Sequence, residues 1–250
     1  MYAATIFLPL LGAVLAGMLA FAPAGTKEAK HRIDRYAQWA SCGGLVLSAL
    51  LSMLIFKDVV LDSQPRTVEL FTWIDSGAVE VSWALKFDAL TAVMILMVCN
   101  VSALIHIYSI GYMHHDPAVP RFMSYLSLFT FFMLMLVTAD NLVQLFFGWE
   151  GVGLASYLLI GFWYDRPSAN AAAIKAFIVN RVGDFGFALG IFVVFVLFQS
   201  VNFDVIFATA PAKAAATIRI FGGEFHALTV ACLLLFVGAM GKSAQLGLHT

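Results

Sequence analysis

The chain has 250 residues, of which 62% are hydrophobic and 12% are charged, and its formal net charge is −1. No soluble domain of this size buries so much apolar surface, so the composition excludes a soluble globular protein and indicates an integral membrane protein in contact with the lipid bilayer. The near-neutral charge argues against a nucleic-acid partner, and no run of Lys and Arg is long enough to form a strong patch for lipid headgroups.

Seven stretches are apolar enough to cross a hydrocarbon core of roughly 30 Å, which takes about 20 residues of helix. We therefore predict an all-α polytopic bundle of about seven transmembrane helices. The stretches are Ala3 to Ala22, Tyr36 to Phe56, Ala89 to Met113, Phe122 to Ala139, Asn141 to Tyr164, Asn170 to Phe203 and Phe225 to Thr250. The first stretch lacks the basic start of a signal peptide, so we expect it to remain as a helix.

The loop between the first two stretches sets the predicted orientation. It carries Lys27, Lys30, Arg32 and Arg35. Short basic loops stay on the cytoplasmic or matrix side, which places the amino terminus and the acidic connection at 57–88 on the outer side. Within that connection, Thr67 to Trp73 partly alternates apolar and polar residues and weakly predicts a hairpin strand.

Two segments follow from this order of elements. Residues 1–118 hold three leading helices, and residues 119–250 hold helices four to seven. The fourth and fifth stretches are separated only by the tight polar turn at Asp140 and Asn141, which predicts an antiparallel helical hairpin. The last stretch reaches Thr250 without a closing loop, so we interpret the chain as the front part of a longer protein.

Glu150 is the only charged residue between Asn141 and Tyr164. An acidic residue at a helix centre costs about 2.5–3.5 kcal/mol to insert, so it usually faces a polar interior and has a function. The small residues Gly148, Gly151 and Gly153 would let neighbouring helices approach closely. We interpret Glu150 as a proton carrier. The alternative is a carboxylate that only joins helices through a hydrogen bond.

Lys242 is the second candidate, because it follows 15 uncharged residues, Ala227 to Gly241. A buried lysine gains and loses its proton readily, so it suits a proton path through the membrane. His249 lies one and a half to two turns further on, and imidazole titrates in the range that a relay needs. The alternative for Lys242 is that its side chain reaches the inner surface.

Lys175, Arg181 and Asp184 leave two interpretations open. Phe185 to Phe203 is long enough to span the membrane alone, which would leave the three charges in an interfacial turn, whereas one longer helix would bury them. On a single helix, Arg181 and Asp184 are three residues apart and are expected to pair. Lys175 would then face away from that pair, about 180° around the helix, and point toward Glu150.

The other residues with titratable or reactive side chains are predicted to be structural. His106, alone inside the third stretch, is expected to be a packed and hydrogen-bonded residue. Cys42, Cys99 and Cys232 fall in apolar runs without CxxC or Cys/His spacing, so we expect core residues. We therefore predict no metal and no cofactor in this chain.

Several motifs taken together resemble one family. They are Phe87-Asp88-Ala89-Leu90, His106-Ile107-Tyr108-Ser109-Ile110-Gly111-Tyr112-Met113, Gly148-Trp149-Glu150-Gly151-Val152-Gly153, Asn180-Arg181-Val182-Gly183-Asp184 and Gly241-Lys242-Ser243-Ala244-Gln245. From Phe87 to its end, the chain resembles chain 5, or subunit L, the distal antiporter-like subunit of NADH:quinone oxidoreductase (respiratory complex I). The stretch from Trp149 to Gly153 is the specific part, because related antiporter-like subunits differ there.

The resemblance implies an antiporter-like fold in which three leading helices precede a five-helix half and its inverted copy. This chain would hold the leading helices and an incomplete first repeat. In the family, the positions of Glu150 and Lys242 are implicated in proton transfer, and that of Lys242 lies on a discontinuous helix. Lys175, Arg181 and Asp184 match charged positions of the sixth helix, which favours burial of all three.

The resemblance also implies a multi-pass subunit of an H⁺-translocating NADH:ubiquinone reductase in a bacterial plasma membrane or mitochondrial inner membrane. The chain would carry protons and no electrons, while FMN, iron–sulfur clusters and quinone would belong to partner subunits. Its partners would be other membrane subunits of complex I, above all the adjacent antiporter-like subunit. The alternative is a subunit of an Mrp-type antiporter that exchanges Na⁺ or K⁺ for H⁺.

Overall fold

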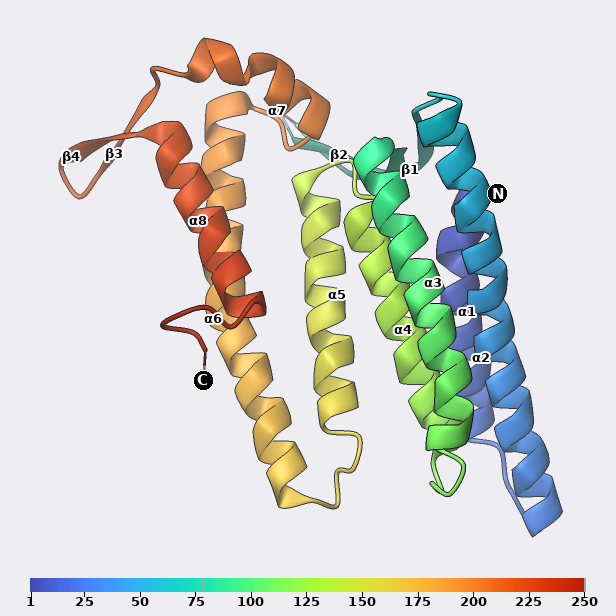
Figure 1. Ribbon diagram of the computed structural model, residues 1–250. Coiled ribbons are helices and arrows are strands. Elements are labelled where there is room, and N and C mark those ends of the chain that lie inside the picture. Colours follow the sequence, from blue (N-terminus) through green and yellow to red (C-terminus); the bar gives the residue numbers. More distant parts are fainter. Residues whose placement is uncertain (78, 250) are drawn as a thin grey trace.

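The computed structural model describes residues 1–77 and 79–249, which form a bundle of long helices with two small hairpins at one end (Figure 1). The helices are α1 (Tyr2–Ala20), α2 (Lys27–Phe56), α3 (Ala89–Tyr112), α4 (Val119–Val137), α5 (Leu142–Ile160), α6 (Pro167–Phe198), α7 (Phe203–Thr209) and α8 (Ala227–Lys242). Within the described residues, α1 to α6 are long and apolar enough to span a membrane. The predicted polytopic bundle is confirmed.

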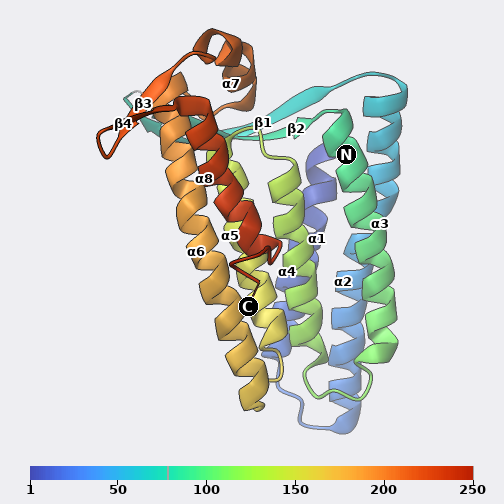
Figure 2. The ribbon, with the colours of Figure 1, turned by 60° about the vertical axis from the view of Figure 1, so that its left-hand side comes forward.

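The bundle has two parts that meet at α5. Helices α1 to α4 pack on one another around a core that includes Ile6, Leu45, Ile95 and Leu134. Helix α5 packs on α4 and on α6, and α8 lies along α6 in both views (Figures 1 and 2). In Figure 1, α8 ends about halfway along α6.

Helix α2 is longer than predicted, because it begins at Lys27 and not near Tyr36. The hydroxyl of Thr26 accepts a hydrogen bond from the amide of Ala29 at 3.1 Å, and Glu28 lies in the first turn. Both features stabilise a helix start. The charged residues that the sequence assigned to a loop therefore extend the helix beyond its apolar part.

The turn between α4 and α5 forms as predicted. Asn141 caps α5, since its side-chain oxygen accepts a hydrogen bond from the amide of Gln144 at 2.9 Å. A Cβ at Gly148 would lie 2.6 Å from the backbone of Leu136, so α4 and α5 touch at the backbone. The predicted antiparallel hairpin is confirmed.

Helix α6 decides between the two interpretations of its charges. It is one helix of 32 residues, about 48 Å long, and it carries Lys175, Arg181 and Asp184 together. A separate helix over Phe185 to Phe203 is therefore wrong. The expected burial of all three charges is also wrong, because Asp184 is buried whereas Lys175 and Arg181 are exposed. Helix α6 ends at Phe198, where Gln199 adopts a left-handed φ of 55°.

The seventh predicted stretch is only partly helical. Helix α8 has 16 residues and stops at Lys242. Residues 243–249 form turns, with left-handed φ at Ala244 and Gly247. The prediction of one span from Phe225 to Thr250 is wrong, because this backbone breaks the helix; Thr250 itself lies outside the described residues.

Two hairpins lie at the same end of the bundle. Strands β1 (Arg66–Ser76) and β2 (Val79–Phe87) form an antiparallel pair, which confirms and lengthens the strand predicted at Thr67 to Trp73. Trp83 of β2 packs edge-on against Phe147 of α5, with ring centroids 4.8 Å apart. Strands β3 (Thr217–Ile220) and β4 (Gly223–His226), like α7, were not predicted.

The three cysteines do not all lie in the core. Cys42 and Cys99 are buried, as predicted, and Cys232 is exposed. The expectation for Cys232 is wrong because α8 contacts α6 along a face of small residues, and Cys232 lies elsewhere on the helix.

Candidate functional site

Charged residues from three helices meet at one level of the bundle. Glu150 lies near the middle of α5, Asp184 lies near the middle of α6, and Lys242 is the last residue of α8. A Cβ at Gly241 would lie 3.2 Å from the Cα of Gly183, which places the end of α8 beside the centre of α6. The interpretation that the Lys242 side chain reaches the inner surface is therefore wrong.

Glu150 pairs with Arg181 across the α5–α6 interface. The distance from Nη1 of Arg181 to Oε2 of Glu150 is 2.5 Å, and the two side chains are 50% and 24% exposed. The second carboxylate oxygen of Glu150, Oε1, is buried and has no hydrogen-bond partner among the described residues. This oxygen is free to accept a proton or a water molecule.

Asp184 has a different partner on α5. It is 4% exposed, and its Oδ1 accepts a hydrogen bond from the indole Nε1 of Trp149 at 2.7 Å. The predicted pair between Arg181 and Asp184 is therefore wrong. The two side chains lie three residues apart on one helix, and each meets a different polar group on α5.

Trp149 is a residue of the site that the sequence analysis missed. Its ring stacks on Phe187 with centroids 4.9 Å apart, which fixes the plane from which Nε1 donates to Asp184. The Nζ of Lys242 lies 5.6 Å from the centroid of the same ring, within the range of a cation–π contact. The sequence did contain a signal, because Trp149 directly precedes Glu150 in a membrane helix. A buried indole N–H needs a hydrogen-bond acceptor, which would have placed Trp149 in a polar site.

The buried ammonium group of Lys242 has no hydrogen-bond partner among residues 1–77 and 79–249. The carboxylates whose charges act on it are those of Asp184 and Glu150. A Cβ at Gly153 would lie 2.7 Å from Nζ, so a larger residue there would displace the ammonium from its place against α5. The predicted close approach at Gly148, Gly151 and Gly153 is confirmed, and at Gly153 the neighbour is the lysine itself.

Glycines also join α6 to α8, which the sequence analysis did not recognise. A Cβ at Gly183 would meet backbone atoms of α8, with the Cα of Gly241 and the carbonyl oxygen of Val237 both at 3.2 Å. A Cβ at Gly238 would lie 2.7 Å from the ring of Phe187. Close packing of small residues is a common means of helix association in membranes, and here it positions Lys242.

Lys175 and His249 lie on the opposite side of Lys242 from Glu150. A cavity of about 610 Å³ is lined by Lys175, Asn180, Lys242 and His249, together with small residues of α6. The cation that contacts Glu150 is Arg181, so the expectation that Lys175 points to Glu150 is wrong. The cavity extends from Lys242 toward the start of α6, and both Lys175 and His249 are exposed.

Toward the other end of the bundle, apolar side chains cover the site. Phe187, Ile191 and Val194 of α6 pack with Leu142 of α5 and Val81 of β2. Phe146 and Trp149 border this cluster. The charged groups therefore have a cavity on the side of the α5–α6 connection and an apolar layer on the side of the hairpins.

Only some of these charges can move a proton. Arg181 does not deprotonate in proteins, so it is a fixed positive charge, whereas Glu150, Asp184 and Lys242 each have a neutral form. With all four groups ionised the site has two charges of each sign. The arrangement can therefore exchange one proton between Lys242 and either Glu150 or Asp184.

Two family models match the chain. The model described as "NADH:quinone oxidoreductase/Mrp antiporter, TM" matches residues 139–250, and the one described as "NADH-Ubiquinone oxidoreductase (complex I), chain 5 N-terminus" matches residues 73–123. The first match contains all six predicted site residues. The second covers β2, α3 and the start of α4.

Curated relatives are about half identical to this chain. NADH-ubiquinone oxidoreductase chain 5 of Chondrus crispus is 51% identical over 258 residues, covering 100% of this chain and 36% of the relative. NADH-quinone oxidoreductase subunit L of Rhodobacter capsulatus is 52% identical over 249 residues, covering 97% and 33%. The chain thus spans about a third of the length of these relatives.

Two solved membrane complexes share the fold. The Mrp complex from Dietzia sp. DQ12-45-1b aligns with a TM-score of 0.71 at 21% identity, over 99% of this chain and 24% of that chain. An archaeal membrane-bound sulfane sulfur reductase aligns with a TM-score of 0.75 at 16% identity, over 96% and 44%. At these identities the likeness concerns the fold alone.

Proposed function

We propose that this chain transfers protons as a membrane subunit of a redox-driven proton pump. The proposal rests on its family, because the chain belongs to the family of NADH:quinone oxidoreductase chain 5 (subunit L). The observation that carries the proposal is the buried Nζ of Lys242, which has no hydrogen-bond partner within the described part of the chain and lies at the depth of the Glu150–Arg181 pair. Intramembrane ionisable residues of this kind usually serve transport.

The chemistry follows from which neighbouring carboxylates are ionised. While Asp184 and Glu150 carry negative charge, they stabilise the ammonium of Lys242. Lys242 forms no ion pair within 4.0 Å among the described residues. Two unit charges 4 Å apart at an effective dielectric constant of about 20 interact by roughly 4 kcal/mol, about a thousandfold in proton affinity, so each carboxylate contributes less than this. Neutralising or withdrawing one carboxylate therefore releases the proton of Lys242.

Arg181 and Trp149 determine which carboxylate is free to change. Arg181 donates to one carboxylate oxygen of Glu150, and Trp149 donates its indole N–H to Asp184. A displacement of Arg181 would leave the carboxylate of Glu150 without its compensating charge. A change in charge in a neighbouring subunit would act through this pair.

The cavity with Lys175 and His249 would deliver protons to Lys242 from the inner side. The basic start of α2 and the exposed Arg166 before α6 assign this end of the bundle to the cytoplasm or matrix, with the amino terminus of the chain outside. The apolar cluster around Phe187 separates Lys242 from the outer side. In this scheme the described residues form an inward-facing half of the path.

The proposed partners are other membrane subunits of the same assembly, in a bacterial plasma membrane or mitochondrial inner membrane. FMN, iron–sulfur clusters and quinone would act in partner subunits, and this chain would contribute charge and proton movement alone. An Mrp-type antiporter shares the fold, but the relatives near 50% identity are chain 5 and subunit L. Co-purification of the full-length protein with flavin and iron–sulfur absorbance separates the two functions.

The test is NADH-driven proton translocation by the assembled complex with Lys242→Arg. A guanidinium keeps the charge and cannot release a proton, so we expect translocation to fall at least tenfold while assembly is retained. Glu150→Gln should act in the same direction, and Lys213→Arg, at an exposed site in the 3₁₀ helix after α7, should have no effect. An unchanged ratio of protons to electrons in the Lys242→Arg complex would remove Lys242 from the path.

A further inference from the structure

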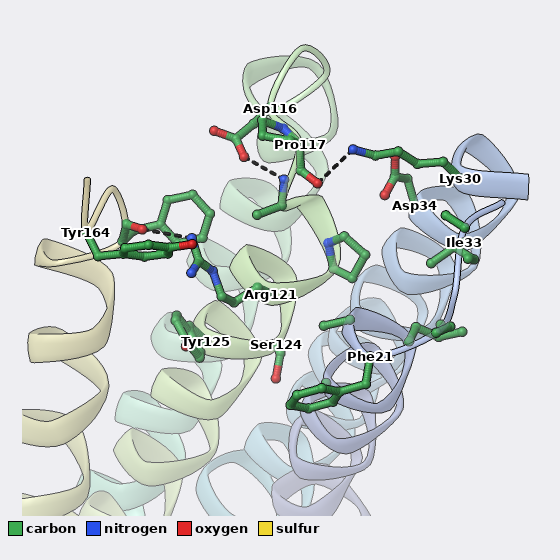
Figure 3. A pocket seen from close by; sticks show the side chains of 18 of the residues that line it. Phe21, Lys30, Ile33, Asp34, Asp116, Pro117, Arg121, Ser124, Tyr125 and Tyr164 are labelled. Carbon is green, nitrogen blue, oxygen red and sulfur yellow. Dashed lines mark hydrogen bonds between the residues drawn. The ribbon is translucent and has the colours of Figure 1, made fainter. Parts of the chain in front are cut away.

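A second cavity, of about 710 Å³, lies away from the proton site (Figure 3). Its walls come from the end of α1, the first turns of α2, the loop before α4, the start of α4 and the connection from α5 to α6. This is the end of the bundle that holds the basic first turns of α2. None of the six candidate proton-path residues lines this cavity.

Two cations in this cavity have unused donors. Arg121 donates through Nη2 to the carbonyl oxygen of Phe162 at 2.9 Å, and its guanidinium lies 4.8 Å from the ring centroid of Tyr164. Its Nε is buried without a hydrogen-bond partner among the described residues. Lys30 donates to the carbonyl oxygen of Pro117 at 2.8 Å, which leaves two of its three ammonium donors.

Two carboxylates in the cavity are also unpaired. Asp116 uses both oxygens, accepting from the amide of Ala118 at 2.8 Å and from the indole of Trp163 at 2.9 Å. Asp34 and Asp165 have no hydrogen-bond or ion-pair partner among residues 1–77 and 79–249. The cavity therefore offers two available positive and two available negative groups.

The rest of the wall is apolar and aromatic. Phe21 is 91% exposed, and Trp163 and Tyr164, also exposed, line another part of the cavity. Aromatic residues of this type concentrate where a bilayer meets water. Leu19 and Ala20 of α1 continue the wall toward the membrane interior, so the cavity suits a molecule with a charged head and an apolar body.

We propose that this cavity binds one phospholipid with a phosphoethanolamine headgroup. The phosphate accepts from Arg121 and Lys30, and the primary ammonium donates to Asp34. An anionic headgroup would leave this carboxylate facing a second negative charge. A choline headgroup has no N–H to donate, so it would leave the carboxylate oxygens unsatisfied. The charges come from two segments far apart in the chain, which is why no basic run in the sequence indicated the site.

The experiment measures the lipid that stays with the purified full-length protein in its assembly. The assembly is reconstituted in nanodiscs that contain equal amounts of phosphatidylethanolamine, phosphatidylcholine and phosphatidylglycerol, extracted in detergent, and analysed by quantitative lipid mass spectrometry. We expect one phosphatidylethanolamine per chain, at least fivefold above either other lipid. Retention of phosphatidylglycerol at an equal or higher level would overturn the assignment.

Variants connect the lipid to the cavity. Asp34→Asn and Arg121→Gln should each lower retained phosphatidylethanolamine at least fivefold. The matched controls are Glu28→Gln and Arg32→Gln, exposed residues of the same first turns of α2 that do not line the cavity. Asp34→Asn leaves the contacts of Arg121 intact, so it remains informative where Arg121→Gln fails to fold. Equal retention in wild type and Asp34→Asn would overturn the proposal.

A last arm separates a lipid from a small soluble ligand. Excess phosphoethanolamine in solution lacks acyl chains and should not release the retained lipid, because the aromatic wall and α1 also hold its apolar body. Release by phosphoethanolamine would show that the headgroup alone fills the site and would overturn the lipid assignment. Proton translocation is not measured here, so this proposal stands or falls independently of the proton path.

Discussion

His106 and Lys242 are both nitrogen bases inside the bundle, and their surroundings differ. His106 of α3 is fully buried, with Nδ1 2.7 Å from the carbonyl oxygen of Ser102 and Nε2 3.1 Å from the hydroxyl of Ser127. The Nζ of Lys242 is buried and has no hydrogen-bond partner among the residues that the structure describes. A buried polar group whose hydrogen bonds are all made stabilises one arrangement of helices. A buried polar group without a hydrogen-bond partner can still bind water or exchange a proton.

The two regions around these bases are held together differently. Around His106, hydroxyl pairs join α2, α3 and α4, with Ser41 to Ser127 and Ser102 to Thr130 both at 2.6 Å. Around Lys242, glycines bring α6 and α8 into backbone contact. Hydrogen bonds thus fix the leading helices, and close packing positions the charges. The prediction that His106 is a packed, hydrogen-bonded residue is confirmed.

Separating α6 from α8 should have the largest effect. Gly183→Leu places a side chain against backbone atoms of α8 that cannot move independently, at a cost of about 3 kcal/mol, since overpacking of a close contact forces the helices apart. We expect less assembled complex in membranes and reduced translocation, because Lys242 leaves its place above Trp149. Gly43→Leu, on a face of α2 with nothing within 4 Å of its Cβ, is the control. Equal losses from both variants would contradict the packing role of Gly183.

Removing the imidazole tests whether the leading region is structural. His106→Leu leaves the hydroxyl of Ser127 and the carbonyl of Ser102 without their histidine partner, at a cost of about 2 kcal/mol. The amount of assembled complex should fall, while the number of protons moved per NADH by each assembled complex stays unchanged. Normal assembly with reduced translocation would place His106 in the proton path and break the contrast with Lys242.

A double-mutant cycle measures the Glu150–Arg181 pair. Arg181→Ala leaves Glu150 without its cation, whereas Arg181→Ala with Glu150→Ala removes both charges. Arg181 is half exposed, so we expect a coupling of about 1 kcal/mol in thermal unfolding, with the double variant recovering part of the loss. Arg181→Ala with Asp184→Ala should show no recovery. Recovery in the second double variant alone would show that Arg181 pairs with Asp184, as the sequence spacing suggested, and not with Glu150.

The smallest effect is expected at Asp140, in the turn between α4 and α5. Burial raises the pKa of its carboxyl group, the charge of Asp204 adds to this, and Lys86 and Asn202 oppose it. Because the folded pKa is raised, the ionised form costs stability. That cost is absent below the ordinary value of 3.8 and develops fully as the pH rises through the folded pKa.

Asp140→Asn should therefore raise the melting temperature at pH 7, by the equivalent of less than about 1 kcal/mol, and should give no gain near pH 3.5. Thermal unfolding of the purified full-length protein at the two pH values measures this. Asp62→Asn, at an exposed residue of the connection between α2 and β1, is the control. A gain of the same size at both pH values would show that ionisation of Asp140 is not its cause.

Hydrophobic length and turn residues in the sequence were sufficient for the outline of the fold. The first six apolar stretches became α1 to α6, and Asp140 and Asn141 gave the hairpin, because a helix that spans lipid satisfies its backbone within itself. The sequence also selected Glu150 and Lys242 through the cost of burying charge. Both are local properties, which require no knowledge of neighbouring helices.

The partners of the charges depended on the tertiary structure. The i, i+3 spacing favoured a pair between Arg181 and Asp184, and α5 instead presents Glu150 to one and Trp149 to the other. The depth of Lys242 likewise depends on glycines of α6 and α8 that face each other from distant parts of the chain. A one-dimensional pattern records which residues are costly to bury. Only the packing of helices determines which groups compensate that cost and which, like the ammonium of Lys242, remain available for chemistry.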